Sequence, residues 1–448
     1  MLKREIKSNP YFQILDWSLY TIVLILSAHF ILGLSLQDKS FGVLLTFLIV
    51  GATSFIEIIR CKDNICIYRV MHIFNYIFLF LAPLQQYSHS VILWRQNGLS
   101  AIYTDTDYLT TNIVIIVAVF FMALGYGMKR NKHKSFDKRP SGLKLTNRSL
   151  FAMLILSTVC LLILFITNNV KDDTMIVKTA SFNDQIVNIL KYIPVSSLLI
   201  YLMCYKKGEI KHKGVYLVIM IAEVGTIFFP FWGTIPRFIL LGTYMVFYAF
   251  LFSDTKHKSI YFFAMFIGFC YMFSDMKFAK SYTFSFDTIN FVHVDYDAYQ
   301  LLMLCVKHIN AEGTFWGLNL LSSAMFFIPR SIARWKMLGT GGIVVGAFHS
   351  WFKNVSMPYI GELYAAFGWL GVTVFGYLSG ALIRLIDNWK NDKSFLKNGV
   401  FFIITGMTIY IMRGALLATF SYTMGLVLTF YLINKVCLTL NKTRTKDT

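Results

Sequence analysis

The sequence predicts an all-α integral membrane protein that crosses the bilayer many times and carries one long polar loop. Three observations lead to this prediction. Hydrophobic residues make up 56% of the 448-residue chain and charged residues only 15%, whereas soluble domains keep roughly a quarter of their residues charged. Apolar stretches long enough to cross a ~30 Å hydrocarbon core recur along the whole length. The segment from Asp275 to Glu362 is the one long, charge-rich interruption.

The apolar stretches predict about twelve transmembrane helices. No linker or soluble domain separates them, so we expect residues 1–448 to form a single integral membrane domain. The first stretch has span length and no small-residue cleavage site after it, so we expect a span and not a removable signal peptide. The expected spans are 14–36, 41–59, 69–87, 111–128, 149–168, 186–205, 215–230, 237–253, 259–274, 363–386, 399–417 and 419–437.

The net charge of +19 reports on topology. With the N-terminus placed in the cytoplasm, most lysines and arginines fall in the cytoplasmic loops, as the positive-inside rule expects. Charges in the outer loops nearly cancel. This distribution excludes nucleic acid as a partner and predicts that both termini are cytoplasmic. The basic segments on that side are 3–7, 60–69, 129–148, 206–213, 256–258, 390–397 and 442–446.

The seven cysteines show no CxxC motif, no metal-ligand spacing and no paired arrangement in the outer loops. No disulfide, metal site or other cofactor is therefore expected. Internal repeats are not evident either, which weakens the case for an inverted-repeat transporter.

Four ionisable residues are expected at membrane depth, where they are costly and usually face a cavity or a partner. Lys191 is expected to snorkel to the interface. For Glu223, a basic partner on a neighbouring helix and a functional role both stay open. Arg237, which follows a Gly- and Pro-broken turn at 230–236, and Arg413 approach the same outer face as the long loop. They indicate an outward-facing anion site, with separate interfacial anchors as the alternative.

The long outer loop, 275–362, lies between the ninth and tenth expected spans. Residues 295–309 have helix-forming composition and one apolar face, which predicts an amphipathic helix lying flat on the membrane surface. Residues 315–329 are apolar but too short to cross, so a surface or re-entrant helix is expected.

Cations concentrate in the next part of the loop. Arg330 and Arg334 are four residues apart and would share one face of a helical segment. Arginine forks match phosphate oxygens in bidentate fashion, and Lys336 adds a point charge. Glycines at 339, 341 and 342 would allow close backbone approach to a ligand. A phosphate site and simple contact with lipid headgroups both fit this cluster.

Short motifs in this region resemble those of the O-antigen polymerases, the Wzy-type oligosaccharide repeat unit polymerases. Ile328-Pro-Arg-Ser331 with Lys336 resembles their outer-loop signature, and residues 358–371 are similar to the segment that leads into the next span. Arg413-Gly414 resembles a late-span pair, and Asp295-Tyr-Asp297 an acidic-aromatic step.

The resemblance covers roughly residues 230–415. It departs from the family's pattern where Ala333-Arg334-Trp335 stands in place of Trp-Pro, and where Met337 replaces the proline expected after the lysine.

The resemblance implies a GT-C-like polymerase/ligase architecture in the bacterial cytoplasmic membrane. It implies a glycosyltransferase that joins lipid-linked oligosaccharides on the outer leaflet. The donor would be an undecaprenyl-pyrophosphate-linked glycan and the acceptor a second lipid-linked repeat unit, and undecaprenyl pyrophosphate would leave. Membrane lipids, a chain-length regulator and a flippase are the further expected partners.

This chemistry sets physical requirements for the site. A leaving pyrophosphate needs fixed positive charge, and the acceptor hydroxyl needs a base. Aromatic rings would bind sugars, with the interfacial aromatic belt as the alternative reading. The pyrophosphate candidates, which would act without a metal, are Arg330, Arg334, Lys336, Arg237 and Arg413; the base candidates, in falling order, are His349, Glu362 and Asp297; the sugar-binding candidates are Trp335, Tyr359 and Tyr364.

Two rival functions remain. An O-antigen ligase would share this fold and chemistry and differ in its acceptor, which the sequence does not reveal. A lipid-linked oligosaccharide flippase or other transporter would keep its charges in a central cavity and lack a long outer loop. The position of the arginines favours the transferase.

Overall fold

The computed structural model describes residues 10–61, 63–127, 143, 145–169, 189–208, 214–228, 237–255, 257, 259–272 and 289–443. All regular structure in these segments is helical, as the sequence predicted. The α-helices are α1 (Pro10–Leu32), α2 (Phe41–Arg60), α3 (Ile67–Tyr76), α4 (Ala82–Ser88), α5 (Asp105–Gly127), α6 (Asn147–Asn169), α8 (Tyr192–Lys206), α9 (Gly214–Phe228), α10 (Arg237–Leu251), α11 (Ser259–Ile267), α12 (Ala298–Glu312), α13 (Leu318–Ala324), α14 (Thr340–Ala347), α15 (Tyr359–Phe367), α16 (Gly376–Asp387), α17 (Phe395–Arg413) and α18 (Leu416–Thr443).

Short π and 3-10 segments join or extend these helices. The π segments are η1 (Ile77–Leu81), η4 (Gly268–Met272) and η7 (Gly371–Phe375), and the 3-10 segments are η2 (Arg95–Asn97), η6 (Val294–Tyr296) and η8 (Asn388–Asn391).

Seven helices among the described residues are long and apolar enough to cross a membrane. Four further apolar helices are shorter. The chain is therefore a multi-pass helical membrane protein, whereas the expected number of twelve spans is not established. The seven long helices lie at Gln13–Leu32, Phe41–Arg60, Ile67–Ser88, Asp105–Gly127, Asn147–Ile166, Phe395–Arg413 and Leu416–Asn441.

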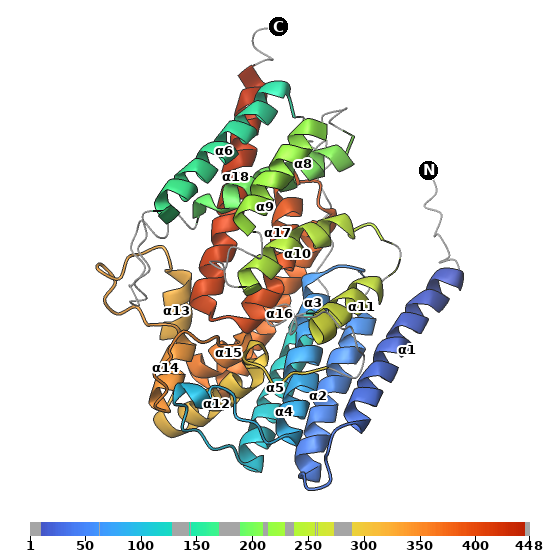
Figure 1. Cartoon of the computed structure of the whole chain (residues 1–448), viewed down its shortest axis with the longest axis vertical. Coiled ribbons are helices and arrows are strands. Elements are labelled where there is room, and N and C mark those ends of the chain that lie inside the picture. The colour runs from blue at the N-terminus through green and yellow to red at the C-terminus, as the bar shows by residue number, and fades with distance from the viewer. Residues whose placement is uncertain are drawn as a thin grey trace.

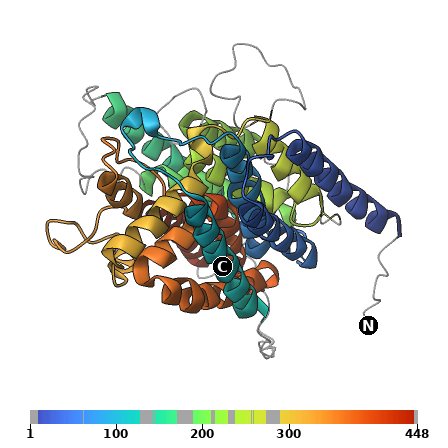
Figure 2. The ribbon, with the colours of Figure 1, turned by 90° about the horizontal axis from the view of Figure 1, so that it is seen from below.

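The helix from Ile67 to Ser88, formed by α3, η1 and α4, is the centre of the bundle. The most apolar 18 residues of this helix are all buried, as expected of a helix that is apolar on all sides. Its α3 part packs against α2, α16, α17 and α11. In Figure 1, α6, α8 and α18 extend toward the C-terminus, and α12, α14 and α15 gather at the opposite end, which we call the loop end. Seen from below in Figure 2, α1 lies at the edge of the bundle.

The helices of the long loop pack into the protein. The helix expected at 295–309 is present as α12, and it is buried on nearly every side against α5, α14 and α15, whereas the sequence predicted only one apolar face. Polar side chains explain the difference, because Tyr299 donates to the Asn112 side chain at 2.9 Å and Gln300 donates to Gln86 at 3.0 Å. The apolar stretch 315–329 forms only the seven-residue α13.

Several features expected from the sequence lie outside the described residues. These are the N-terminal basic segment 3–7, most of the basic segment 129–148, the turn at 230–236 and the loop residues 275–288. All seven cysteines are free.

Glu223, the carboxylate expected at membrane depth, lies in α9 against α6. The Thr158 hydroxyl donates to its Oε1 at 2.7 Å. The partner is thus a hydroxyl and not the basic residue considered from the sequence. Its Oε2 is buried and has no hydrogen-bond partner among the described residues.

Helices α5 and α16 cross with their backbones in contact. A Cβ added at Gly380 would collide with the carbonyl of Met122, and one added at Gly125 would collide with the carbonyl of Tyr377. Small residues at both contact points allow this approach, which is how helices associate in membranes in the absence of a hydrophobic driving force.

This crossing gives a matched pair of glycine substitutions on α16. Gly380→Ala should lower the thermal unfolding midpoint in detergent, because the added methyl group meets backbone and overpacking costs about 1–3 kcal/mol. Gly376→Ala should leave the midpoint unchanged or raise it, since its methyl would lie 3.5 Å from the Ala118 carbonyl oxygen and alanine favours a helix. Equal midpoints for the two variants would contradict the close crossing.

Candidate functional site

Arg413, the last residue of α17, forms a buried ion pair at the loop end. Its Nη2 donates to Oδ1 of Asp297 at 2.9 Å. The same guanidinium donates to the carbonyl oxygens of Asp295 at 3.1 Å and Val294 at 3.2 Å, and it lies 4.0 Å above the ring of Phe238. Arg413 thereby ties α17 to the start of α12 and to α10.

Asp297 has a hydrogen-bond donor for each of its carboxylate oxygens. Besides Arg413, Ser356 donates to Oδ1 at 3.1 Å and the indole of Trp94 donates to Oδ2 at 3.0 Å. Complete burial raises the pKa of Asp297, and the nearby Arg413 charge opposes that rise. A carboxylate satisfied in this way holds structure together and has little freedom to accept a proton from a substrate.

Arg237, the first residue of α10, reaches the same segment. Its Nη1 donates to Oδ2 of Asp295 at 3.0 Å, and His293 lies 3.2 Å from the same oxygen. Burial would raise the pKa of Asp295, but the contacts with His293, Arg413 and Arg237 hold it below its ordinary value. Arg237 and Arg413 therefore meet through one acidic segment, which neutralises much of their charge.

Glu362, in the first turn of α15, is the second buried carboxylate of the loop end. Only 1% of the residue is exposed. Its Oε2 accepts from the Thr340 hydroxyl at 2.6 Å and from the Asn319 amide at 2.9 Å. Its Oε1 accepts from the backbone N–H of Leu416 at 2.9 Å. Burial raises the pKa of Glu362, and these three hydrogen bonds limit the rise.

The partners of Glu362 come from three helices. Asn319 lies in α13, Thr340 begins α14, and Leu416 begins α18. The residues between α13 and α14 include Arg330, Arg334 and Lys336. Glu362 therefore holds the helices on both sides of these cations. Negative charge at the start of α18 is also favoured by the helix dipole.

The segment 325–339, which we call the cationic segment, is not helical. Arg330 and Arg334 therefore do not share a helical face as the spacing suggested. Lys336 is nearly buried, and its ammonium donates to the carbonyl oxygens of Phe326 at 2.8 Å and Ile328 at 3.0 Å. Burial lowers the pKa of Lys336, and the neighbouring Arg330 charge lowers it further.

Arg330 and Lys336 lie close together, and no carboxylate of the described residues pairs with either of them. Arg330 donates to the carbonyl oxygen of Met337 at 3.2 Å, and its Nε is buried without a partner in the described part of the chain. No ion pair among the described residues involves Arg330, Arg334 or Lys336. Uncompensated positive charge in a partly buried place favours an anionic ligand.

The other residues singled out from the sequence lie in different surroundings. His349 is exposed and follows α14 with a left-handed backbone, φ 62°. Trp335 is 45% exposed. Tyr364 is buried and donates to Asn310 at 2.7 Å, and the hydroxyl of Tyr359 lies 2.5 Å from that of Ser379. Both tyrosine hydroxyls are thus engaged within the protein.

The glycines after the cationic segment approach the protein's own backbone. A Cβ at Gly341 would collide with the carbonyl of Ser356, and one at Gly342 would lie 2.8 Å from the carbonyl oxygen of Lys353. They bring α14 against the segment that leads into α15, instead of leaving room for a ligand.

Sequence reasoning missed four residues that complete these networks: Trp94, Asn319, Thr340 and Ser356. Asn319 could have been found from the sequence, because it is a polar residue inside an apolar stretch, where an unpaired amide is costly. The other three carry no such mark in the sequence.

The chain is a multi-pass helical membrane protein in which two buried carboxylates lie at the loop end, together with cations that form no ion pair among the described residues. Residues 355–444 match the family described as O-antigen polysaccharide polymerase Wzy. This match confirms the resemblance stated above, and it supports the Wzy-type O-antigen polymerase family and a polymerase role in general. No curated protein and no solved structure matches the chain.

The Asp297–Arg413 pair predicts a large effect of removing one partner. Arg413→Met should lower the free energy of unfolding by about 3–5 kcal/mol, because it leaves a buried carboxylate uncompensated. Lys397→Met, on the same helix, should change it by at most about 1 kcal/mol, since the Lys397–Asp392 pair is exposed. Denaturant unfolding in detergent measures both, and similar losses for the two variants would contradict the buried pair.

Proposed function

We propose that this protein is a glycosyltransferase of the bacterial cytoplasmic membrane, with both termini in the cytoplasm. It polymerises undecaprenyl-pyrophosphate-linked oligosaccharide repeat units into surface polysaccharide on the outer leaflet. The observation that carries the proposal is the cationic segment, where Arg330 and Lys336 adjoin each other without a carboxylate partner among the described residues. The family match over residues 355–444 supports the reaction class.

The cationic segment suits the leaving group of this reaction. Transfer of the glycan breaks the bond between its anomeric carbon and the pyrophosphate, and negative charge develops on the departing oxygen. Fixed positive charge at that position lowers the barrier. Arg330 and Lys336 are held by backbone carbonyls, so their positions are set before the donor arrives, and exposed Arg334 extends the positive surface.

The two arginines outside the cationic segment have a different part in the proposal. Arg237 and Arg413 are paired with Asp295 and Asp297, so most of their charge is balanced within the protein. We assign them to positioning the start of α12 at the loop end, and we assign direct contact with the pyrophosphate to the cationic segment.

The acceptor hydroxyl must lose a proton as the new glycosidic bond forms. Of the three base candidates, Asp297 and Glu362 are buried with their carboxylate oxygens engaged. His349 is exposed, and its ring makes no hydrogen bond among the described residues. We therefore assign the base to His349 and give Glu362 the role of holding the cationic segment. Exposed Trp335 is the candidate platform for a sugar ring.

The proposal predicts a specific defect in cells. Arg330→Ala and Lys336→Ala should each reduce polymerisation by about 10²-fold, the usual effect of removing one group that stabilises developing charge, at normal protein level. Lys307→Ala, which removes a half-buried cation paired with Asp107, is the control and should leave chain length unchanged. Electrophoresis of the surface polysaccharide measures chain length, and immunoblotting measures the level of the protein in each variant.

The surface glycan of a deletion strain separates this function from its rivals. A polymerase defect leaves surface glycan of one repeat unit, whereas loss of a flippase leaves none. Normal long chains in both Arg330→Ala and Lys336→Ala would overturn the assignment of the cationic segment. Absence of all surface glycan from the deletion strain would overturn the polymerase itself.

A further inference from the structure

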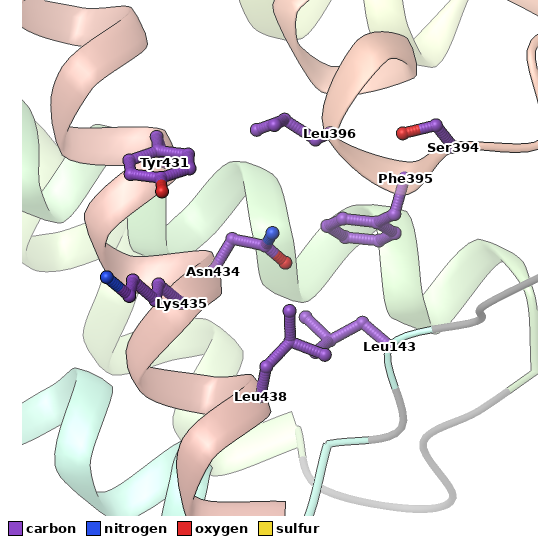
Figure 3. A pocket seen from close by; sticks show the side chains of 8 residues that line it. All are labelled: Leu143, Ser394, Phe395, Leu396, Tyr431, Asn434, Lys435 and Leu438. Atoms are coloured by element: carbon purple, nitrogen blue, oxygen red, sulfur yellow. The ribbon is translucent and has the colours of Figure 1, made fainter.

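A cavity of about 310 Å³ lies at the end of the bundle away from the candidate site. It is formed by the first turn of α17, the last turns of α18 and the side chain of Leu143 (Figure 3). Arg413 is at the other end of α17, about 27 Å away at 1.5 Å per residue. The volume is within the range of small-molecule sites, ~300–1,000 Å³.

Asn434 places an unsatisfied acceptor in this cavity. The residue is only 7% exposed, and its Oδ1 is buried without a hydrogen-bond partner among the described residues. Figure 3 shows its amide pointing from α18 toward the ring of Phe395. A buried polar atom left unpaired costs about 1–3 kcal/mol, so a ligand that donates a hydrogen bond to Oδ1 would gain free energy here.

Positive charge surrounds the same cavity. Lys435 lines it, and Lys207 lies on its Phe395 wall with its ammonium 5.2 Å from the ring centre. Within the described segments neither lysine forms an ion pair. The N-terminus of α17, capped by Ser394, adds the partial positive charge of a helix dipole. The cavity therefore favours an anion that also carries a hydrogen-bond donor.

Apolar surface continues outward from the cavity along α18. Leu438 and Tyr431 line it and are 41% and 42% exposed, and Leu428 and Leu432 extend the exposed apolar face at 46% and 48%. In a membrane-spanning helix this face lies against lipid chains. An occupant with an anionic, hydroxylated head and long apolar chains would match all three parts of the site.

We propose that this cavity binds the headgroup of an anionic glycerophospholipid, with phosphatidylglycerol as the best-matched class. The phosphate lies by Lys435 and the N-terminus of α17, a headgroup hydroxyl donates to Oδ1 of Asn434, and the acyl chains follow α18. Phosphatidylethanolamine supplies the donor but is neutral overall. Phosphatidylcholine supplies neither a donor nor net charge.

The test compares lipids that differ in one property at a time. The full-length protein in neutral detergent is titrated with dioctanoyl phosphatidylglycerol and with dioctanoyl phosphatidylmethanol, which has the same charge but no hydroxyl, and bound lipid is counted by native mass spectrometry. Phosphatidylglycerol should bind about five-fold more tightly, the effect of one hydrogen bond. Equal affinities for the two lipids would overturn the role of Asn434.

Three variants assign the effects to residues. Asn434→Leu should remove the difference between the two lipids. Lys435→Gln should weaken the binding of both lipids by about three-fold or more, because it removes a positive charge. It should keep the difference in affinity between them, because Oδ1 of Asn434 is still present. Leu438→Trp should block both lipids by filling the cavity. Arg60→Gln, which removes an exposed cation paired with Glu57, should leave the affinity for both lipids unchanged.

Two outcomes would overturn the proposal as a whole. One is unchanged phosphatidylglycerol binding in both Lys435→Gln and Leu438→Trp. The other is binding of glycerol 3-phosphate as tight as that of the lipid, which would mark the cavity as a site for a soluble phosphate.

Discussion

The buried carboxylate of Glu362 is the interaction on which the arrangement of the loop end depends. A carboxylate that is 1% exposed and has no cation among its described partners is stable only because three donors face it. Those donors belong to α13, α14 and α18, so the cost of burying the charge is offset only when all three helices are in place. The helices on either side of Arg330 and Lys336 are thereby fixed by one side chain.

The Asp297–Arg413 pair likewise joins separate helices through a buried carboxylate. Arg413 ends α17, and only two residues separate it from the start of α18, so the two networks meet at the α17–α18 turn. Each also joins residues inside the family match to residues outside it. Glu362, Arg413 and Leu416 lie within 355–444, whereas Asp297 and Thr340 lie before it. The matched segment therefore contains one half of each network, and residues before position 355 supply the other half.

Much of the fold could be predicted from the sequence, because membrane helices follow from apolar length. Each expected span overlaps a helix, yet only seven of the described helices meet the length and composition of a span. The convergence of Arg237 and Arg413 at one end of the bundle also followed from their positions. The burial of residues 295–309 against other helices did not follow from the sequence, since one apolar face on a helix does not reveal that Tyr299 and Gln300 find polar partners inside the protein.

The roles within the site were harder to predict, because a carboxylate looks the same in sequence whether it is free or fully hydrogen-bonded. Glu362 and Asp297 were candidate bases by residue type, and only the structure reveals their donors. Likewise, the spacing of Arg330 and Arg334 predicts a shared face only if the segment is helical, which depends on tertiary contacts.

Hydrogen exchange measured by mass spectrometry shows whether Glu362 fixes the cationic segment. In Glu362→Ala, the amides of residues 325–339 and the first turn of α18 should exchange at least about 10-fold faster than in the wild-type protein, because local opening no longer breaks those hydrogen bonds. Exchange in α2 and α5 should stay the same. Unchanged exchange across residues 325–339 in that variant would mean that Glu362 does not hold the cationic segment in place.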